Sequence, residues 1–169
     1  MTAKEKLHYA VSNSVDPLAI IEAAAKAGFY QETGFRSKYG GGASGYFKQF
    51  GASAADGALR EFDSNFLFAS LLHQDPRYYH TSHRSFSYRM GYALSRVFVT
   101  RGDSGQTEFN WSSVLGSAAA AGMSNVYLPA KDRTASMAVG NFGWFLVGEG
   151  FNRVLEEFMP NLYHRLKHT

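Results

Sequence analysis

Three widely separated stripes of small residues constrain how this chain can fold. They are Gly51, Ala55 and Ala58; Ser113, Gly116, Ala120 and Ser124; and Ser136, Gly140, Gly143 and Gly150. Each stripe repeats at helical spacing and therefore follows one face of a helix. A glycine inside a helix costs about 1 kcal/mol relative to alanine, so repeated glycines need a compensating benefit. Because small side chains let helix backbones approach closely, we expect these stripes to be packing faces between helices.

Length and composition predict a single helical domain over residues 1–169. The chain has 169 residues, 45% of them hydrophobic, which is enough apolar material for one core. In a β alternative, residues 96–100 and parts of 137–150 form strands. Alanine-rich stretches, helical spacing of apolar positions and the scarcity of Val, Ile and Thr argue against it. We therefore predict an all-α fold, a compact bundle of about five to seven helices with small-residue packing faces.

Capping residues and prolines set the expected helix boundaries. Asp16 and Pro17 are a typical N-cap and first helical residue, and Gly28 is the expected C-cap of that helix. Further helices are expected over residues 46–62 with a continuation over 66–72, and over 85–100, 110–127 and 134–159. Pro76, Pro129 and Pro160 are expected to end the helical segments that precede them.

One segment is long enough to cross a bilayer. Residues 109–130 carry no charge, but their serines and asparagines make them only weakly apolar. The sequence therefore favours a buried helix there over a transmembrane one.

Several function classes lack support in the sequence. The chain has no cysteine, which excludes a disulfide scaffold, cysteine-ligated zinc, iron–sulfur clusters and thiol catalysis. A net charge of +3 is too small to indicate a nucleic-acid partner, so none is expected. No Gly-x-Ser-x-Gly elbow occurs, and no Gly-Lys-Ser/Thr follows the glycine-rich residues 40–45, which excludes a P-loop.

A basic, aromatic segment is the leading candidate site. No acidic residue occurs between Asp75 and Asp103, while arginine recurs among tyrosines and phenylalanines. The arginines are Arg77, Arg84, Arg89, Arg96 and Arg101. Guanidinium groups bind phosphates and anionic lipid headgroups, so the segment predicts such a site. In the alternative interpretation these arginines are a solvated face that pairs with carboxylates elsewhere, namely Asp56, Glu61, Asp63, Glu149, Glu156 or Glu157.

A cluster of His73, Asp75, His80 and His83 supports an alternative function. Imidazole and carboxylate are the zinc or iron ligands that remain when cysteine is absent. Around an open metal position they would activate water in a metal-dependent hydrolase. The spacing matches no standard helical ligand pair, and Asp75 before Pro76 is also typical of a turn. Outside this alternative we expect no cofactor.

Most of the chain resembles a known group of bacterial sequences. The resemblance lies in residues 46–52 (YFKQFGA), 72–79 (LHQDPRYY), 91–101 (GYALSRVFVTR), 103–105 (DSG), 122–125 (GMSN) and 157–160 (EFMP). These segments resemble a family of uncharacterised exported bacterial proteins that is frequent in Acidobacteria. The resemblance implies no enzymatic activity and no role for any residue.

The resemblance also implies a location in the bacterial cell envelope, in the periplasm or at the outer membrane. Residues 1–9 have no apolar core and are not a signal peptide, so the chain is expected to be either a processed form or an intracellular protein. The prediction is a non-enzymatic envelope protein that associates with an anionic membrane surface or a protein partner, with self-association left open.

Overall fold

The computed structural model describes residues 1–35, 39–81 and 84–167, with side chains up to Met159. Its first half contains α1 (Ala3–Ser14), α2 (Pro17–Thr33), α3 (Gly42–Glu61), the π-helical η2 (Phe62–Phe68), α4 (Ala69–Leu71) and β1 (Gln74–Asp75). Its second half contains α5 (Phe86–Ser95), β2 (Val99–Gly102), β3 (Thr107–Phe109), α6 (Trp111–Ser124), the 3-10 turn η3 (Ala130–Asp132) and α7 (Ala135–Lys167). The predicted all-α class is confirmed.

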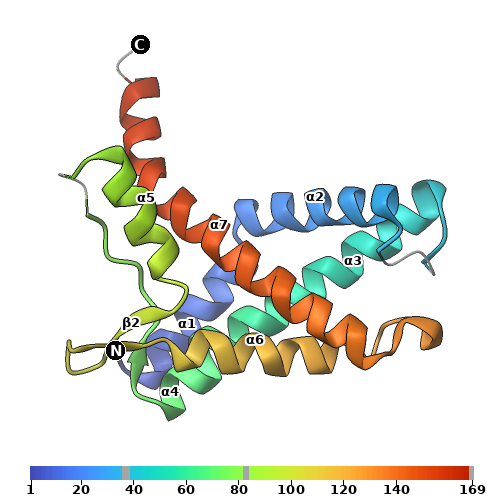
Figure 1. Cartoon of the computed structure of the whole chain (residues 1–169), viewed down its shortest axis with the longest axis horizontal. Helices are drawn as coiled ribbons and strands as arrows, with labels where there is room; N and C mark the ends of the chain where they lie inside the picture. The colour runs from blue at the N-terminus through green and yellow to red at the C-terminus, as the bar shows by residue number, and fades with distance from the viewer. Residues whose placement is uncertain (36–38, 82–83, 168–169) are drawn as a thin grey trace.

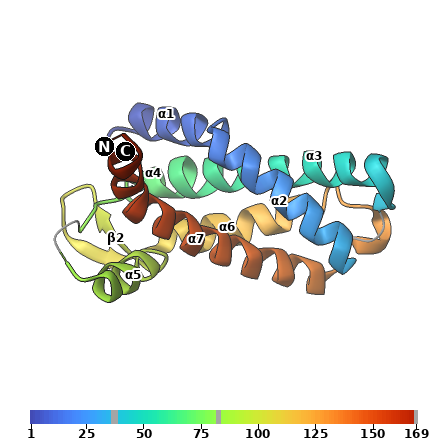
Figure 2. The same ribbon diagram turned by 90° about the horizontal axis from the view of Figure 1, so that it is seen from above.

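The continuous run of α3, η2 and α4 is the centre of the bundle (Figures 1 and 2). Helix α2 packs beside α3, and both α1 and α6 pack on η2. The long helix α7 crosses α6 and also contacts α5. Helix α5 and the small sheet lie together at one end of the molecule, far from the connection between α6 and α7.

The sheet corrects the helix that we predicted over residues 85–100. Helix α5 stops at Ser95, and the next residues enter an antiparallel sheet in the order β1, β2, β3. Val99 pairs with Phe109 and Asp75 pairs with Arg101. Strand β2 therefore gains hydrogen-bond partners from both neighbours, and its β-branched residues suit that conformation. Strand β2 includes Val99 and Thr100, so the β alternative is correct for the end of residues 96–100.

Two predicted helix boundaries are wrong and one is confirmed. The Asp16 side chain caps α2 by accepting a 2.8 Å hydrogen bond from the Leu18 amide. The helix does not stop at Gly28, because Gly34 is the glycine that takes the left-handed conformation, at φ 68°. Helix α7 also continues past Pro160 to Lys167, although a proline inside a helix removes a backbone hydrogen bond and clashes with the preceding turn.

Only the second small-residue stripe is a close packing face along its whole length. Its four members on α6 are all buried, and α6 packs there on η2. A Cβ atom added to Gly116 would lie 2.4 Å from Ser64 Oγ and 2.5 Å from Ser64 Cα. By contrast, Gly51 is exposed, and a Cβ on the exposed Gly143 would meet nothing within 4 Å. The first stripe is therefore exposed or half-buried, and the third is mixed, since Gly150 is buried and a Cβ on Gly140 would lie 3.0 Å from the Phe35 ring. Helical spacing defines a face but not its partner.

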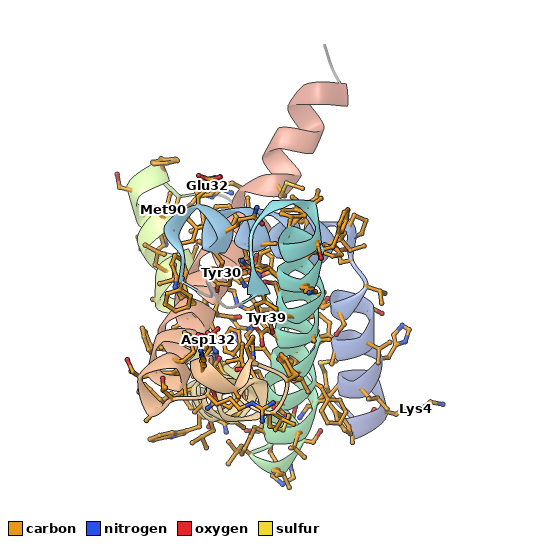
Figure 3. All side chains as sticks on the ribbon, turned by 90° about the vertical axis from the view of Figure 1, so that its right-hand side faces the viewer. Lys4, Tyr30, Glu32, Tyr39, Met90 and Asp132 are labelled. Carbon is orange, nitrogen blue, oxygen red and sulfur yellow. The ribbon has the colours of Figure 1, made fainter. Side chains whose placement is uncertain are left out.

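The interior is unusually polar, and many apolar side chains lie outside. Ala120, Ala121 and Phe145 form the apolar core cluster, with Leu59 and Phe142 packed against it. Tyr30 is also buried between the helices, whereas Lys4 points away from them (Figure 3). The exposed apolar side chains include Val15, Ile21, Phe47, Leu71, Phe86, Val126, Val139 and Phe151. These side chains are spread over α2, α3, α4, α5 and α7, the C-cap of α1 and the turn after α6.

Within the described residues, no helix combines the length and the apolar character needed to cross a bilayer. The uncharged segment 109–130 runs from the last residue of β3 through helix α6 to the first residue of η3, and α6 buries its small-residue face against η2.

Candidate functional site

The basic segment predicted from the sequence gathers at one end of the molecule. This region, called the arginine-aromatic end below, comprises residues 75–81 and 84–111 and contains α5, β2 and β3 (Figure 1). The five predicted arginines all belong to it, but they have different environments. Among the described residues, two of them form ion pairs and three do not.

Arg77 is paired with Asp75, two residues before it. Its Nε lies 3.0 Å from Asp75 Oδ1 and its Nη2 lies 2.5 Å from Oδ2. The Tyr79 hydroxyl donates a further 2.9 Å hydrogen bond to Oδ2. Burial raises the pKa of Asp75, but the hydrogen bonds from Arg77 and Tyr79 outweigh it and hold that pKa below its ordinary value. Asp75 is therefore an ionised anchor for the turn.

Arg89 is buried and paired with Glu157 of α7. Arg89 Nε lies 2.6 Å from Glu157 Oε1, and Glu157 Oε2 accepts a 2.9 Å hydrogen bond from the Tyr78 hydroxyl. The Thr81 amide also donates to this carboxylate. Glu157 thus fixes α5 and the preceding loop to α7. Arg89 therefore makes a carboxylate pairing that the alternative interpretation of the sequence included.

Arg84, Arg96 and Arg101 have no carboxylate partner within the described part of the chain. Each guanidinium lies over a tyrosine ring. The distances to the ring centroids are 5.5 Å for Arg84 on Tyr88, 4.6 Å for Arg96 on Tyr92 and 4.3 Å for Arg101 on Tyr79. Contact with a ring face orients a cation without occupying its N–H donors. These three arginines can therefore bind an anionic oxygen ligand.

The arginine-aromatic end also carries exposed aromatic side chains. Phe98 stacks on Phe109 at 6.3 Å, and Phe109 meets Trp111 edge-on at 4.7 Å. The three residues are 46%, 42% and 52% exposed. Phe86 and Tyr88 of α5 are exposed as well. Aromatic rings beside arginines are typical of surfaces that sit at the membrane–water interface.

The predicted metal cluster is not assembled by the described residues. Asp75 is occupied by Arg77 and Tyr79, and the His80 Nδ1 atom lies 3.8 Å from Glu157 Oε2. The side chains of residues 1–35, 39–81 and 84–159 form no group of three or more potential metal ligands. His83 lies outside the described residues. Elemental analysis of untagged protein decides this alternative, since stoichiometric zinc or iron that is lost in His73→Ala would support it.

Sequence reasoning missed a buried ionic network between α3 and α7. Arg60 donates hydrogen bonds to Glu61 and Glu149, and Arg153 contacts Glu149 Oε1 at 2.6 Å and Glu156 Oε2 at 2.9 Å. We had considered these three glutamates as partners of the arginine-aromatic end, and they pair with Arg60 and Arg153 instead. Glu149 and Arg153 are four residues apart in one helix, and this spacing is the sequence signal from which the pair could have been predicted.

Comparisons of the chain with protein-family models, curated proteins and solved structures find no match. The site is therefore interpreted from its own geometry.

Proposed function

We propose that this protein is a non-enzymatic envelope protein that associates with an anionic membrane surface through its arginine-aromatic end. One observation carries the proposal. Arg84, Arg96 and Arg101 have no carboxylate partner in the described part of the chain, and they lie in the same region as the exposed stack of Phe98, Phe109 and Trp111.

The chemistry of this region matches a lipid headgroup layer. A basic residue near an anionic bilayer contributes about 1 kcal/mol of attraction, and guanidinium groups hydrogen-bond phosphate oxygens. Aromatic rings sit at headgroup depth, where one side is apolar and the other is wet. Arg77 and Arg89 support the site indirectly, because their ion pairs with Asp75 and Glu157 hold the segment in place.

The resemblance to exported bacterial proteins supports the envelope location in this proposal.

Co-sedimentation with vesicles tests the proposal. We expect the protein to bind vesicles that contain phosphatidylglycerol, to bind pure phosphatidylcholine vesicles less, and to lose binding as salt rises. The double variant Arg84→Gln/Arg101→Gln should bind the anionic vesicles roughly tenfold to thirtyfold more weakly, since it removes two headgroup contacts.

The matched control is Lys48→Gln/Lys131→Gln, which removes the same charge from exposed positions on α3 and η3. The control should bind nearly as well as the unmodified protein. Equal losses in the two double variants would mean that only net charge matters and would refute the site. Absence of binding even at low salt would refute the membrane proposal and favour a protein partner for the same surface.

A further inference from the structure

A cavity of about 310 Å³ lies between α1, α2, α3 and α7. This volume is at the lower end of the range for small-molecule sites. The described residues that line it lie outside the arginine-aromatic end. Part of its wall is apolar and comes from α2 and α7, with Leu18, Ile20 and Leu155 among the lining side chains.

The polar part of the cavity wall is the buried network of α3 and α7. Arg60 joins Glu61 to Glu149, and Arg153 joins Glu149 to Glu156. Two guanidinium groups therefore face three carboxylates, which leaves one surplus negative charge. Burial makes an uncompensated charge costly, so a positive group in the cavity would be stabilised there.

The remaining charged residues around the cavity do not remove this surplus. Glu22 and Lys26 neutralise each other across 2.5 Å, and Asp16 is a second acid at the rim. Among the described lining residues the cations are Lys26, Arg60 and Arg153, and the acids are Asp16, Glu22, Glu61, Glu149 and Glu156. The cavity is therefore electronegative.

Glu156 is the carboxylate best placed to receive a ligand. Its side chain is 36% exposed, whereas that of Glu149 is 4% exposed and is shared by two arginines. Burial and the neighbouring Glu149 raise the pKa of Glu156 against the opposing effect of Arg153, so its negative charge is incompletely compensated.

The hydroxyl of Ser53, a residue only 2% exposed in the cavity wall, lacks a hydrogen-bond partner among the described residues. The Nε–H donor of Arg153 also lacks a partner there, but an ammonium group offers no acceptor for it. A buried polar group without a partner costs free energy, which a bound polar ligand can recover. The Ser53 hydroxyl can accept a hydrogen bond from a ligand N–H group.

We propose that this cavity binds a small amphipathic primary amine, with its ammonium group at Glu156 and its hydrocarbon chain against Leu18, Ile20 and Leu155. A fatty acid of the same length fits less well, because both arginines already hold carboxylates and the cavity repels a further anion. The proposed membrane association does not depend on this site.

A ligand series with one chain length and three head groups tests the proposal by isothermal titration calorimetry. We expect hexylamine to bind roughly tenfold more tightly than 1-hexanol, as a hydrogen bond to a charged group implies, and hexanoate to bind more weakly than either. Hexanoate binding as tightly as hexylamine, or no heat from hexylamine, would overturn the proposal.

Two variants locate the site. Glu156→Gln should remove the preference for hexylamine over 1-hexanol, while Glu32→Gln, the same change at an exposed position outside the cavity, should keep it. Ala58→Phe should block the cavity from an exposed wall position and abolish binding of all three probes, with Ala43→Phe on the same helix as its control. An unchanged preference in Glu156→Gln, or unchanged binding in Ala58→Phe, would refute the assignment.

Discussion

Replacing Glu149 by glutamine is expected to destabilise the protein by about 3–5 kcal/mol, the usual effect of breaking a buried ion pair. Glu149 is 3% exposed and accepts from both Arg60 and Arg153. The variant leaves two buried guanidinium groups without the carboxylate that they share. Urea denaturation followed by circular dichroism measures the change in the free energy of unfolding.

Glu156→Gln is the control within the same network. Its carboxylate is more exposed and its pKa is raised, so its charge is less favourable in the folded protein than in the unfolded chain. We expect this variant to lose far less stability than Glu149→Gln. A Glu149→Gln variant within about 1 kcal/mol of the unmodified protein would show that the network does not hold α3 against α7.

The same contact predicts a pH dependence. Burial raises the pKa of Glu149, but Arg153 and Arg60 outweigh it and lower that pKa to about 2 from an ordinary value of 4.5. Since the unfolded chain binds the proton first, this stabilisation is complete above about 4.5 and is lost as pH falls toward 2. The stability difference between the unmodified protein and Glu149→Gln should therefore shrink across that window.

Gly116→Ala is expected to cost about 1–3 kcal/mol, although alanine is the better helix former. The added Cβ would lie 2.5 Å from both the Cα and the amide nitrogen of Ser64, so backbone has to move. Gly143→Ala is the matched control, because its Cβ meets nothing within 4 Å. That control should gain up to about 1 kcal/mol.

Thermal unfolding separates these two glycine variants. For a chain of this size, 1 kcal/mol corresponds to about 2–4 °C in the unfolding midpoint. We expect the midpoint of Gly116→Ala to fall and that of Gly143→Ala to rise or stay constant. A Gly116→Ala protein as stable as Gly143→Ala would contradict the close packing of α6 on η2.

The sequence predicted local structure better than pairing between distant segments. The Asp16 cap and the helix over 110–127, observed as Trp111–Ser124, follow from residues near each other in the chain. The strands could not be predicted in the same way, because β1 has two residues and pairs with Gly102 and Arg101 far along the chain. The glycine stripes show the same limit, since Gly116 and Gly143 both belong to stripes at helical spacing but have different surroundings.

The sequence predicted which segment forms the candidate site, but not which of its arginines form ion pairs and which lack a carboxylate partner among the described residues. The run of arginines among aromatic residues was visible in the sequence. The alternative interpretation named Glu157 among the possible carboxylate partners, but it could not assign Glu157 to Arg89, because the two residues are 68 positions apart. The buried network at Arg60 was missed for the same reason, since Glu149 is 89 positions away.

Tryptophan fluorescence tests the membrane contact most directly. The chain has two tryptophans, exposed Trp111 in the arginine-aromatic end and Trp144, which packs edge-on against Phe29 at 5.1 Å. In a Trp144→Phe variant, Trp111 is the only tryptophan. We expect its emission to shift to the blue on vesicles that contain phosphatidylglycerol and to be quenched by brominated lipid chains. Emission from Trp111 that stays unchanged while the protein sediments with those vesicles would contradict the proposed orientation on the membrane.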